Sequence, residues 1–201
     1  LEWTAAVGHA TQLARDAMQR GAARIVVCGG DGTLNEVAIA LTGSGTAIGF
    51  IPAGRGNDFA RALQLPTEVR YAVDGIMFGR EHEMDVGEIN GRIFLTVAAV
   101  GFDGEVAQRV AKGAWSLLGT KAYVGGTLQV LTNFHAPRMT IRGDFGERQG
   151  KYMLVATGNT SAYGGGIHIV PGAAPDDGYF DCCIVKEVSK LRLLTLLPAA
   201  Y

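Results

Sequence analysis

The stretch Cys28-Gly29-Gly30-Asp31-Gly32-Thr33-Leu34-Asn35-Glu36-Val37 decides the fold, because a strand there gives way through glycines to a helix. Before it, residues 24–28 form a short apolar, β-branched run that is typical of a buried strand. After it, apolar residues recur at helical spacing over 34–41. Thr33 and Glu36 have the spacing of a capping box. We therefore predict a strand, a glycine turn and a helix that begins near Thr33.

This glycine turn is a candidate anion site. The start of a helix presents amide groups without partners in the helix, and glycines let a phosphate come close to them. The stretch lacks the Gly-Lys-Ser or Gly-Lys-Thr of a Walker loop, and Asn35 stands where a dinucleotide fingerprint needs its third glycine. Asp31 would repel polyphosphate unless Mg²⁺ lies between them or the carboxylate serves a substrate hydroxyl as base. Both options indicate phosphoryl transfer from a nucleotide; the alternative is an aspartate that only closes a turn.

A second strand and glycine turn follow the first. Residues 46–51 predict a strand, and residues 52–58 predict a turn rich in glycine. A short helix is expected over 59–63, capped by Asn57 or Asp58. Successive strand–turn–helix units are typical of an open parallel sheet, whose ligands bind beyond the carboxyl ends of its strands. We expect both turns to face one nucleotide, and two unrelated turns are the alternative.

The N-terminal residues predict an amphipathic helix. It spans residues 4–20, with Thr4 as its cap and Gly21 as its end. Because such a helix needs a sheet to lie on, we expect that a preceding strand is missing. His9 on this helix is interpreted as a packing or capping residue rather than a catalytic one.

From about residue 85 the pattern changes to short extended runs separated by glycine and proline, which predicts a β-sandwich. A helix is expected over 104–131 and a core-packing helix over 191–197. The fold class is α/β: a nucleotide domain of parallel sheet and flanking helices over 1–84, with its first strand missing, and then a β-sandwich domain over 85–201, with its C-terminal part missing. The extended runs are residues 84–88, 92–99, 139–142, 152–157, 167–170 and 179–185.

Composition excludes several classes of protein. A net charge of −1 over 201 residues gives no bulk attraction to nucleic acid, which we do not expect as a partner. The cysteines Cys28, Cys182 and Cys183 have no Cys-x-x-Cys spacing, so they indicate neither a zinc site nor a disulfide framework. We expect reduced, buried thiols in a cytoplasmic protein. No apolar run reaches the roughly 18 residues of a membrane span.

Several segments, in order along the chain, resemble the bacterial diacylglycerol kinase and lipid kinase family, whose catalytic domain is shared with sphingosine and ceramide kinases. Gly-Gly-Asp-Gly alone also occurs in NAD kinases and phosphofructokinases, so the specific part is Asn57-Asp58-Phe59-Ala60-Arg61. The resemblance implies an ATP-dependent kinase whose lipid cleft lies between a nucleotide domain and a β-sandwich. The segments are residues 29–36, residues 52–61, Gly101-Phe102-Asp103, Tyr163-Gly164-Gly165-Gly166 and residues 171–178.

The resemblance also implies site residues. Asp31 would take the proton of the substrate hydroxyl, as in the sphingosine kinase branch, whereas the bacterial branch assigns this role to an Asp-Gly-Glu segment that is absent after Asp181. Asp31, Asp58 and Asp85 would form an acidic network with Mg²⁺ and ATP. The nucleotide contacts would be Thr4, Gly29, Gly30, Asp31, Gly32, Thr33, Leu34, Asn35, Glu36, Arg55, Gly56, Asn57 and Asp58.

A second metal site is implied near residue 177. In the bacterial family a structural Mg²⁺ matches Asp177 with the backbone oxygens of Ala174 and Tyr179, whereas Asp176-Asp177-Gly178 by itself indicates a turn. Arg55 stands where the family has threonine, so its extra cation either strengthens phosphate binding or marks divergence. Because the resemblance implies a first phosphate loop and a terminal acidic segment that this sequence does not show, we expect the chain to bind nucleotide poorly and not to turn over.

The function that we expect is an ATP- and Mg²⁺-dependent lipid kinase that transfers the γ-phosphoryl group to the hydroxyl of diacylglycerol or a similar lipid. Such an enzyme would belong to phospholipid metabolism and act peripherally at the inner membrane surface. A small-molecule kinase of the NAD kinase type is one alternative, and a non-catalytic nucleotide or lipid sensor is another. A homodimer is left open, as is the lipid headgroup.

Overall fold

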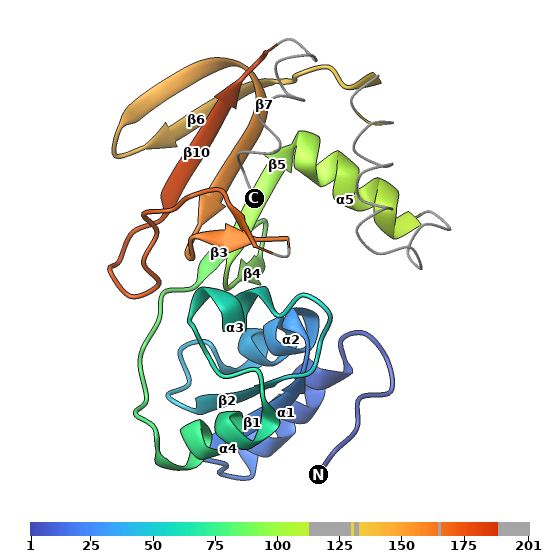
Figure 1. Ribbon diagram of the computed structural model, residues 1–201, viewed down its shortest axis with the longest axis vertical. Helices are drawn as coiled ribbons and strands as arrows, with labels where there is room; N and C mark the ends of the chain where they lie inside the picture. The colour runs from blue at the N-terminus through green and yellow to red at the C-terminus, as the bar shows by residue number, and fades with distance from the viewer. Residues whose placement is uncertain (113–129, 131–132, 165, 189–201) are drawn as a thin grey trace. The chain divides into compact units, whose positions relative to one another are not determined.

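The computed structural model describes residues 1–112, 130, 133–164 and 166–188, and the chain forms two compact units (Figure 1). Unit 1 contains Leu1–Val97 and Gly158–Phe180, and unit 2 contains Ala98–Thr157 and Asp181–Tyr201. This division by contacts differs from the expected domains 1–84 and 85–201, because the chain returns to unit 1 after residue 157. The predicted order, an α/β part followed by a β part, is confirmed.

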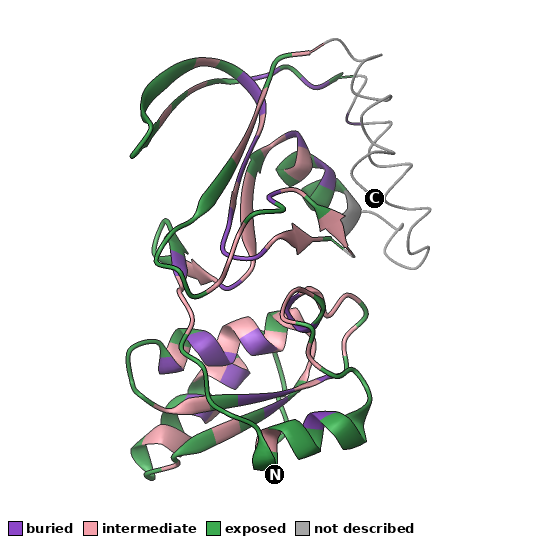
Figure 2. Cartoon of the chain, turned by 60° about the vertical axis from the view of Figure 1, so that its left-hand side comes forward, coloured by how far each residue is buried: buried purple, intermediate pink, exposed green. Residues whose placement is uncertain are grey.

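Unit 1 is built on the predicted parallel strand pair. Strands β1 (Arg24–Gly29) and β2 (Ala47–Pro52) run parallel, with Arg24 opposite Ala47 and Gly29 opposite Pro52. Helices α1 (His9–Gln19), α2 (Asp31–Leu41) and α4 (Val69–Phe78) belong to the same unit. The core joins β1, β2, α1 and α2, and Figure 2 colours buried residues purple; its buried members are Ala10, Ala14, Val27, Leu34, Val37, Ala38, Leu41, Phe50, Phe59, Ala60 and Leu95.

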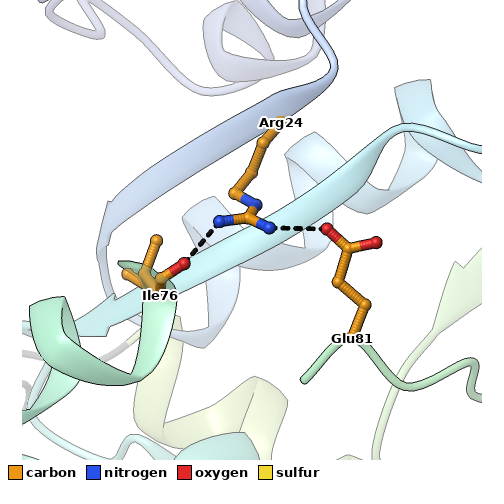
Figure 3. Close-up of polar contacts among 3 residues, drawn as sticks. All are labelled: Arg24, Ile76 and Glu81. Carbon is orange, nitrogen blue, oxygen red and sulfur yellow. Dashed lines mark hydrogen bonds and ion pairs between the residues drawn. The ribbon is translucent and has the colours of Figure 1, made fainter. Parts of the chain in front are cut away.

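Arg24 ties the end of α4 to the start of β1 (Figure 3). Its guanidinium donates to the carbonyl oxygen of Ile76 and, from Nη2, to Glu81 Oε1 at 2.6 Å. On β2, Gly49 leaves room for Ile76, since a Cβ atom there would lie 3.0 Å from two carbons of that side chain. The helix α4 was not predicted, because its apolar residues are not confined to one side: Val69, Tyr71, Met77 and Phe78 are all exposed.

One predicted helix start and one predicted helix cap were wrong. Helix α1 begins at His9 rather than at Thr4, because Gly8 adopts a left-handed conformation with φ of 85°. Helix α2 begins at Asp31 with Gly30 as N-cap, so Thr33 and Glu36 do not form the expected capping box. The expected burial of β1 was also wrong in part, since Val27 is buried but Val26 is 50% exposed.

Two hairpins and one short helix complete unit 1. Strand β3 (Gly87–Ile89) pairs with β4 (Arg92–Phe94), and β8 (Ala162–Tyr163) pairs with β9 (Ile167–His168), both antiparallel. Helix α3 (Asp58–Ala62) lies near the predicted position. The fully buried Asn159 brings the returning chain into this unit, because its Nδ2 donates to the carbonyl oxygens of Asp85 at 2.7 Å and Leu95 at 3.0 Å.

Unit 2 contains a four-stranded sheet and one described helix. The strand order is β10-β7-β5, and β6 pairs antiparallel with β7. Its elements are β5 (Val97–Gly101), α5 (Phe102–Lys112), β6 (Arg138–Gly143), β7 (Gly146–Gly158) and β10 (Asp181–Lys186). Phe102 and Phe134 meet edge to face in its core, with ring centroids 5.4 Å apart. Most of the expected helix 104–131 beyond residue 112, and all of 191–197, lie outside the described residues.

Unit 2 also contains two of the cysteines, and all three thiols are free. The expected burial was wrong, because Cys28 and Cys182 are exposed and Cys183 is half-buried. Burial raises the pKa of the Cys183 thiol, and the neighbouring Cys182 adds to this. In the described part of the chain, no helix has the length and apolar character needed to cross a membrane.

Candidate active site

The two predicted glycine turns lie against each other at the carboxyl ends of β1 and β2. Ala53 N donates to Gly29 O at 2.7 Å. A Cβ atom on Gly54 would lie 2.5 Å from Gly30 Cα, closer than any side chain allows. Glycine is therefore required at residue 54, since the backbones of the two turns touch there. The two turns are therefore in contact, and the expectation that both face one nucleotide stays a prediction.

Asp31 joins the two turns through its side chain. Its carboxylate accepts hydrogen bonds from Asp58 N at 3.1 Å and from Phe59 N at 3.0 Å, which are the first amides of α3. Asn57, one of the two predicted cap residues, occupies the N-cap position of α3, but its side chain makes no capping hydrogen bond. Asn57 instead closes its own turn, because its side-chain amide exchanges two 2.9 Å hydrogen bonds with the backbone of Gly54.

Asp58 extends this arrangement to a third loop. Its Oδ2 accepts a hydrogen bond from Gly164 N at 2.8 Å, so the segment Tyr163–Gly164 is attached to the start of α3. Asp85 binds a different loop: its Oδ2 accepts from Gly178 N at 2.7 Å, and its own amide donates to Pro175 O at 2.6 Å. The structure thus brings Asp31 and Asp58 together, whereas Asp85 holds the loop of residues 175–178.

The start of α2 has the properties of an anion site. A helix leaves its first amide groups without partners of its own, and here these belong to Asp31, Gly32 and Thr33. Gly32 is exposed, and a Cβ atom there would have no neighbour within 4 Å. The Thr33 side chain packs over Gly29, where a Cβ atom would lie 3.0 Å from it. The open space beside Gly32 leaves room for a phosphate group near these amides.

A cavity of about 280 Å³ adjoins this helix start within unit 1. Asp31 lies at its wall, while most of the remaining lining is apolar. Asn35 helps to shape it, because its Nδ2 donates to Ile93 O at 3.3 Å and so attaches α2 to β4. The cavity was not predicted, although four of its lining residues, 93–96, belong to the predicted extended run 92–99. Its lining residues are Asp31, Gly32, Leu34, Asn35, Phe59, Ile93, Phe94, Leu95 and Thr96.

Some predicted nucleotide contacts point elsewhere. Leu34 is 1% exposed and belongs to the core. The Glu36 carboxylate accepts hydrogen bonds from Gly8 N and Ala10 N at the start of α1. Thr4 and Arg55 are exposed, so their expected contacts with a nucleotide stay predictions. The predicted residues that gather at the meeting point of the turns are Gly29, Gly30, Asp31, Gly32, Thr33, Gly56, Asn57 and Asp58.

The predicted metal loop forms a turn. Asp177 Oδ1 accepts a hydrogen bond from Tyr179 N at 2.9 Å, and Gly178 between them has φ of 78°. This local bond is the turn that Asp176-Asp177-Gly178 indicates by sequence alone. Across the described residues, no three or more His, Cys, Asp or Glu side chains are grouped so that they could hold a metal ion. The set Ala174, Asp177 and Tyr179 therefore stays a prediction.

Comparison with known proteins agrees with this architecture. Residues 1–89 match the family model described as diacylglycerol kinase catalytic domain. Residues 96–201 match the model described as YegS C-terminal NAD kinase beta sandwich-like domain. A diacylglycerol kinase of Staphylococcus carnosus is 36% identical over 98% of this chain, and one of Staphylococcus saprophyticus is 35% identical over the same share.

Solved structures show the same fold. A putative diacylglycerol kinase from Bacillus anthracis superposes with a TM-score of 0.80 at 24% identity, covering 98% of this chain and 68% of that one. A diacylglycerol kinase structure from the same organism has a TM-score of 0.73 at 26% identity, covering 97% of this chain and 64% of that one. The chain spans 65% of the length of the two staphylococcal relatives. It belongs to the diacylglycerol kinase family, in which a diacylglycerol kinase catalytic domain precedes a YegS-type β-sandwich domain.

Proposed function

We propose that the protein is an ATP- and Mg²⁺-dependent lipid kinase, which transfers the γ-phosphoryl group of ATP to the hydroxyl of diacylglycerol or a similar lipid. One observation carries the proposal. Asp31 stands at the start of α2, where an anion is favoured, and it also lines a mainly apolar cavity. A carboxylate between a phosphate site and an apolar site is the arrangement that phosphorylation of a lipid alcohol requires.

The phosphate side of the reaction uses the backbone. The first amides of α2 bind and orient the polyphosphate, and the glycine turns let it approach them closely. The exposed Arg55 adds a cation on the second turn. Catalysis of phosphoryl transfer is mostly positioning and charge neutralisation, so a fixed framework of backbone amides suits it. The contact between Gly30 and Gly54 makes the two turns one such framework.

The acceptor side uses Asp31 and the cavity. The hydroxyl oxygen attacks the γ-phosphorus, the bond to the β–γ bridging oxygen breaks, ADP leaves, and the hydroxyl proton passes to the Asp31 carboxylate. Each carboxylate oxygen has two lone pairs, so the hydrogen bonds from Asp58 N and Phe59 N leave room for this proton. The apolar wall of Phe59, Ile93 and Phe94 suits an uncharged, hydrocarbon-rich acceptor.

The carboxylates at the meeting point of the two turns are suitable ligands for Mg²⁺. Asp31 and Asp58 carry carboxylate groups, which are the ligands that Mg²⁺ accepts alongside phosphate oxygens and water. When bound, the ion would neutralise charge on the polyphosphate. Because the acceptor is a membrane lipid, the protein would act at the inner membrane surface, peripherally and from the cytoplasm.

A transfer assay tests the proposal. The protein is incubated with Mg²⁺ and ATP labelled in the γ-phosphate, against diacylglycerol, sphingosine, ceramide, undecaprenol and NAD in separate reactions. We expect label in a lipid, and a loss of roughly 10²- to 10⁴-fold in rate for Asp31→Ala. Asp74→Ala, which removes an exposed carboxylate on α4, is the matched control and should keep the wild-type rate.

Asp31→Asn separates chemistry from folding in the same assay. Its side-chain oxygen can still accept from one amide of α3, but it cannot take a proton. We expect Asp31→Asn to fold and to lose about as much rate as Asp31→Ala. Wild-type activity in Asp31→Asn would contradict the assignment of the base. Label in NAD alone would contradict a lipid acceptor, and bound ATP without any transfer would favour a sensor.

A further inference from the structure

We infer that Glu36 is a positioning residue: its carboxylate caps α1 from the neighbouring helix α2, and it thereby fixes the turn that follows Thr4 against the helix that begins at the phosphate site. The inference concerns the alignment of ATP, and in that respect it rests on the proposed function. It replaces the expected direct contact between Glu36 and the nucleotide.

The cap uses both oxygens of the carboxylate. Oε1 accepts a hydrogen bond from Gly8 N at 2.8 Å, and Oε2 accepts one from Ala10 N at 3.2 Å. Helix α1 has no cap of its own, because its N-cap residue is a glycine. The backbone of Glu36 adds a third link, since Thr11 Oγ1 donates to Glu36 O at 2.7 Å. The negative charge of the carboxylate also interacts favourably with the positive end of the α1 helix dipole, and its hydrogen bonds to the helix amides are charge-assisted.

The turn before α1 is closed on itself. Ala5 N donates to Nδ1 of His9 at 2.9 Å, and His9 N donates to Ala6 O at 3.2 Å. These bonds give residues 5–9 a defined shape, but all of them lie within the turn. The hydrogen bonds from Gly8, Ala10 and Thr11 to Glu36 attach this turn to α2. Thr4 directly precedes the turn and is exposed.

The attachment point lies on α2, the helix whose start is the candidate phosphate site. Glu36 follows Asp31 by five residues on one helix, which is about 7.5 Å along the axis. A carboxylate there would repel polyphosphate if it faced the ligand, but the capping bonds turn it toward α1. Glu36 therefore acts on ATP through the turn that it holds, and not by contact. Loosening the turn should weaken ATP binding without slowing the transfer step.

The test compares Glu36→Ala and Glu36→Gln with the wild type. Exchange of the Gly8 and Ala10 amides is followed by NMR without ligand, and the Kd for ATP is measured by calorimetry. KM and kcat come from the transfer assay. We expect Glu36→Ala to speed exchange of both amides, and to raise the Kd and KM for ATP about 3- to 30-fold with kcat changed less than about 2-fold. Glu36→Gln keeps one acceptor oxygen and should lie between the two.

The matched control is Glu68→Ala. Glu68 is the N-cap residue of α4 and is exposed, but its side chain makes no capping hydrogen bond. This variant should leave both the exchange rates and the Kd unchanged. Faster exchange in Glu36→Ala with an unchanged Kd for ATP would overturn the positioning role, and unchanged exchange would overturn the cap itself. A wild-type protein that does not bind ATP would refute the proposed function, while the exchange data would still decide whether the cap exists.

Discussion

Several carboxylates of unit 1 and two of unit 2 have different kinds of partner. In unit 1, Asp31, Glu36, Asp58 and Asp85 accept hydrogen bonds from backbone amides of other segments. In unit 2, Glu147 pairs with Arg142, and Glu187 lies 3.8 Å from Lys151, in both cases at the surface. Unit 1 also contains a surface pair, between Arg24 and Glu81. Neither of these two unit 2 pairs involves the backbone amide of a distant loop.

The difference lies in what each bond connects. The partners of Asp31 are 27 and 28 residues away, that of Asp58 is 106 away, and that of Asp85 is 93 away. Glu147 and Arg142 are only five residues apart on one hairpin. The amides of Asp58 and Phe59 are part-buried, so losing the Asp31 acceptor is costly, whereas exposed ions are well solvated when separated. The acids of unit 1 therefore fix the loops of the candidate site.

The largest effect should come from the backbone contact beneath these carboxylates. Gly54→Ala would place a methyl group 2.5 Å from Gly30 Cα and 2.8 Å from Asn57 Oδ1. We expect a loss of about 1–3 kcal/mol in the free energy of unfolding, since the two turns must separate. Urea unfolding followed by circular dichroism measures it.

Gly32→Ala is the matched control for that substitution. It adds the same methyl group in the same region, but nothing lies within 4 Å of it. Its free energy of unfolding should stay within about 0.5 kcal/mol of the wild type. Equal losses for the two variants would show that the turns do not depend on the Gly30–Gly54 contact, and the comparison between units would lose its basis.

Much of this framework could be predicted from the sequence. The alternation of β-branched runs with glycine turns predicts β1, β2 and their parallel pairing, and the apolar spacing after Asp31 predicts α2. The order of an α/β part and a β part is also confirmed. These features depend on local patterns, which a sequence displays directly.

The hydrogen-bond partners of the polar side chains could not be predicted in the same way. Thr33 and Glu36 have capping-box spacing, yet Glu36 caps α1, because Gly8 and Ala10 lie within reach only after α1 packs on α2. Asp31 indicated a turn, a metal ligand or a base, but its link to α3 spans 27 residues. Likewise the cavity requires β4 to lie beside α2. Tertiary packing decides each of these.

Substitution of Asp85 measures how much one carboxylate acceptor of a backbone amide contributes to the stability of unit 1. Asp85→Ala should lower the free energy of unfolding by about 1 kcal/mol, because Gly178 N loses its acceptor. Asp85→Asn keeps an acceptor oxygen and should recover most of this loss. Thermal or urea unfolding of both variants, with Asp74→Ala as the exposed control, measures the difference. If Asp85→Asn is as unstable as Asp85→Ala, charge rather than hydrogen bonding holds this loop.

The smallest effect is expected at Glu147 in unit 2. The hydrogen bond from Arg142, with a smaller contribution from Gln149, holds the pKa of Glu147 below its ordinary value of 4.5. A carboxyl group whose pKa is lower in the folded state adds stability above pH 4.5 and loses it as pH falls through the lowered pKa. Glu147→Gln should therefore unfold at nearly the same urea concentration as the wild type at pH 7.

The small difference in unfolding midpoint between Glu147→Gln and the wild type should disappear as the pH falls below the lowered pKa of Glu147. Salt should reduce the same difference at pH 7, since exposed charges are screened. A loss at pH 7 as large as that of Asp85→Ala would show that surface pairs and amide-bound carboxylates contribute alike, and the contrast between the two units would then fail.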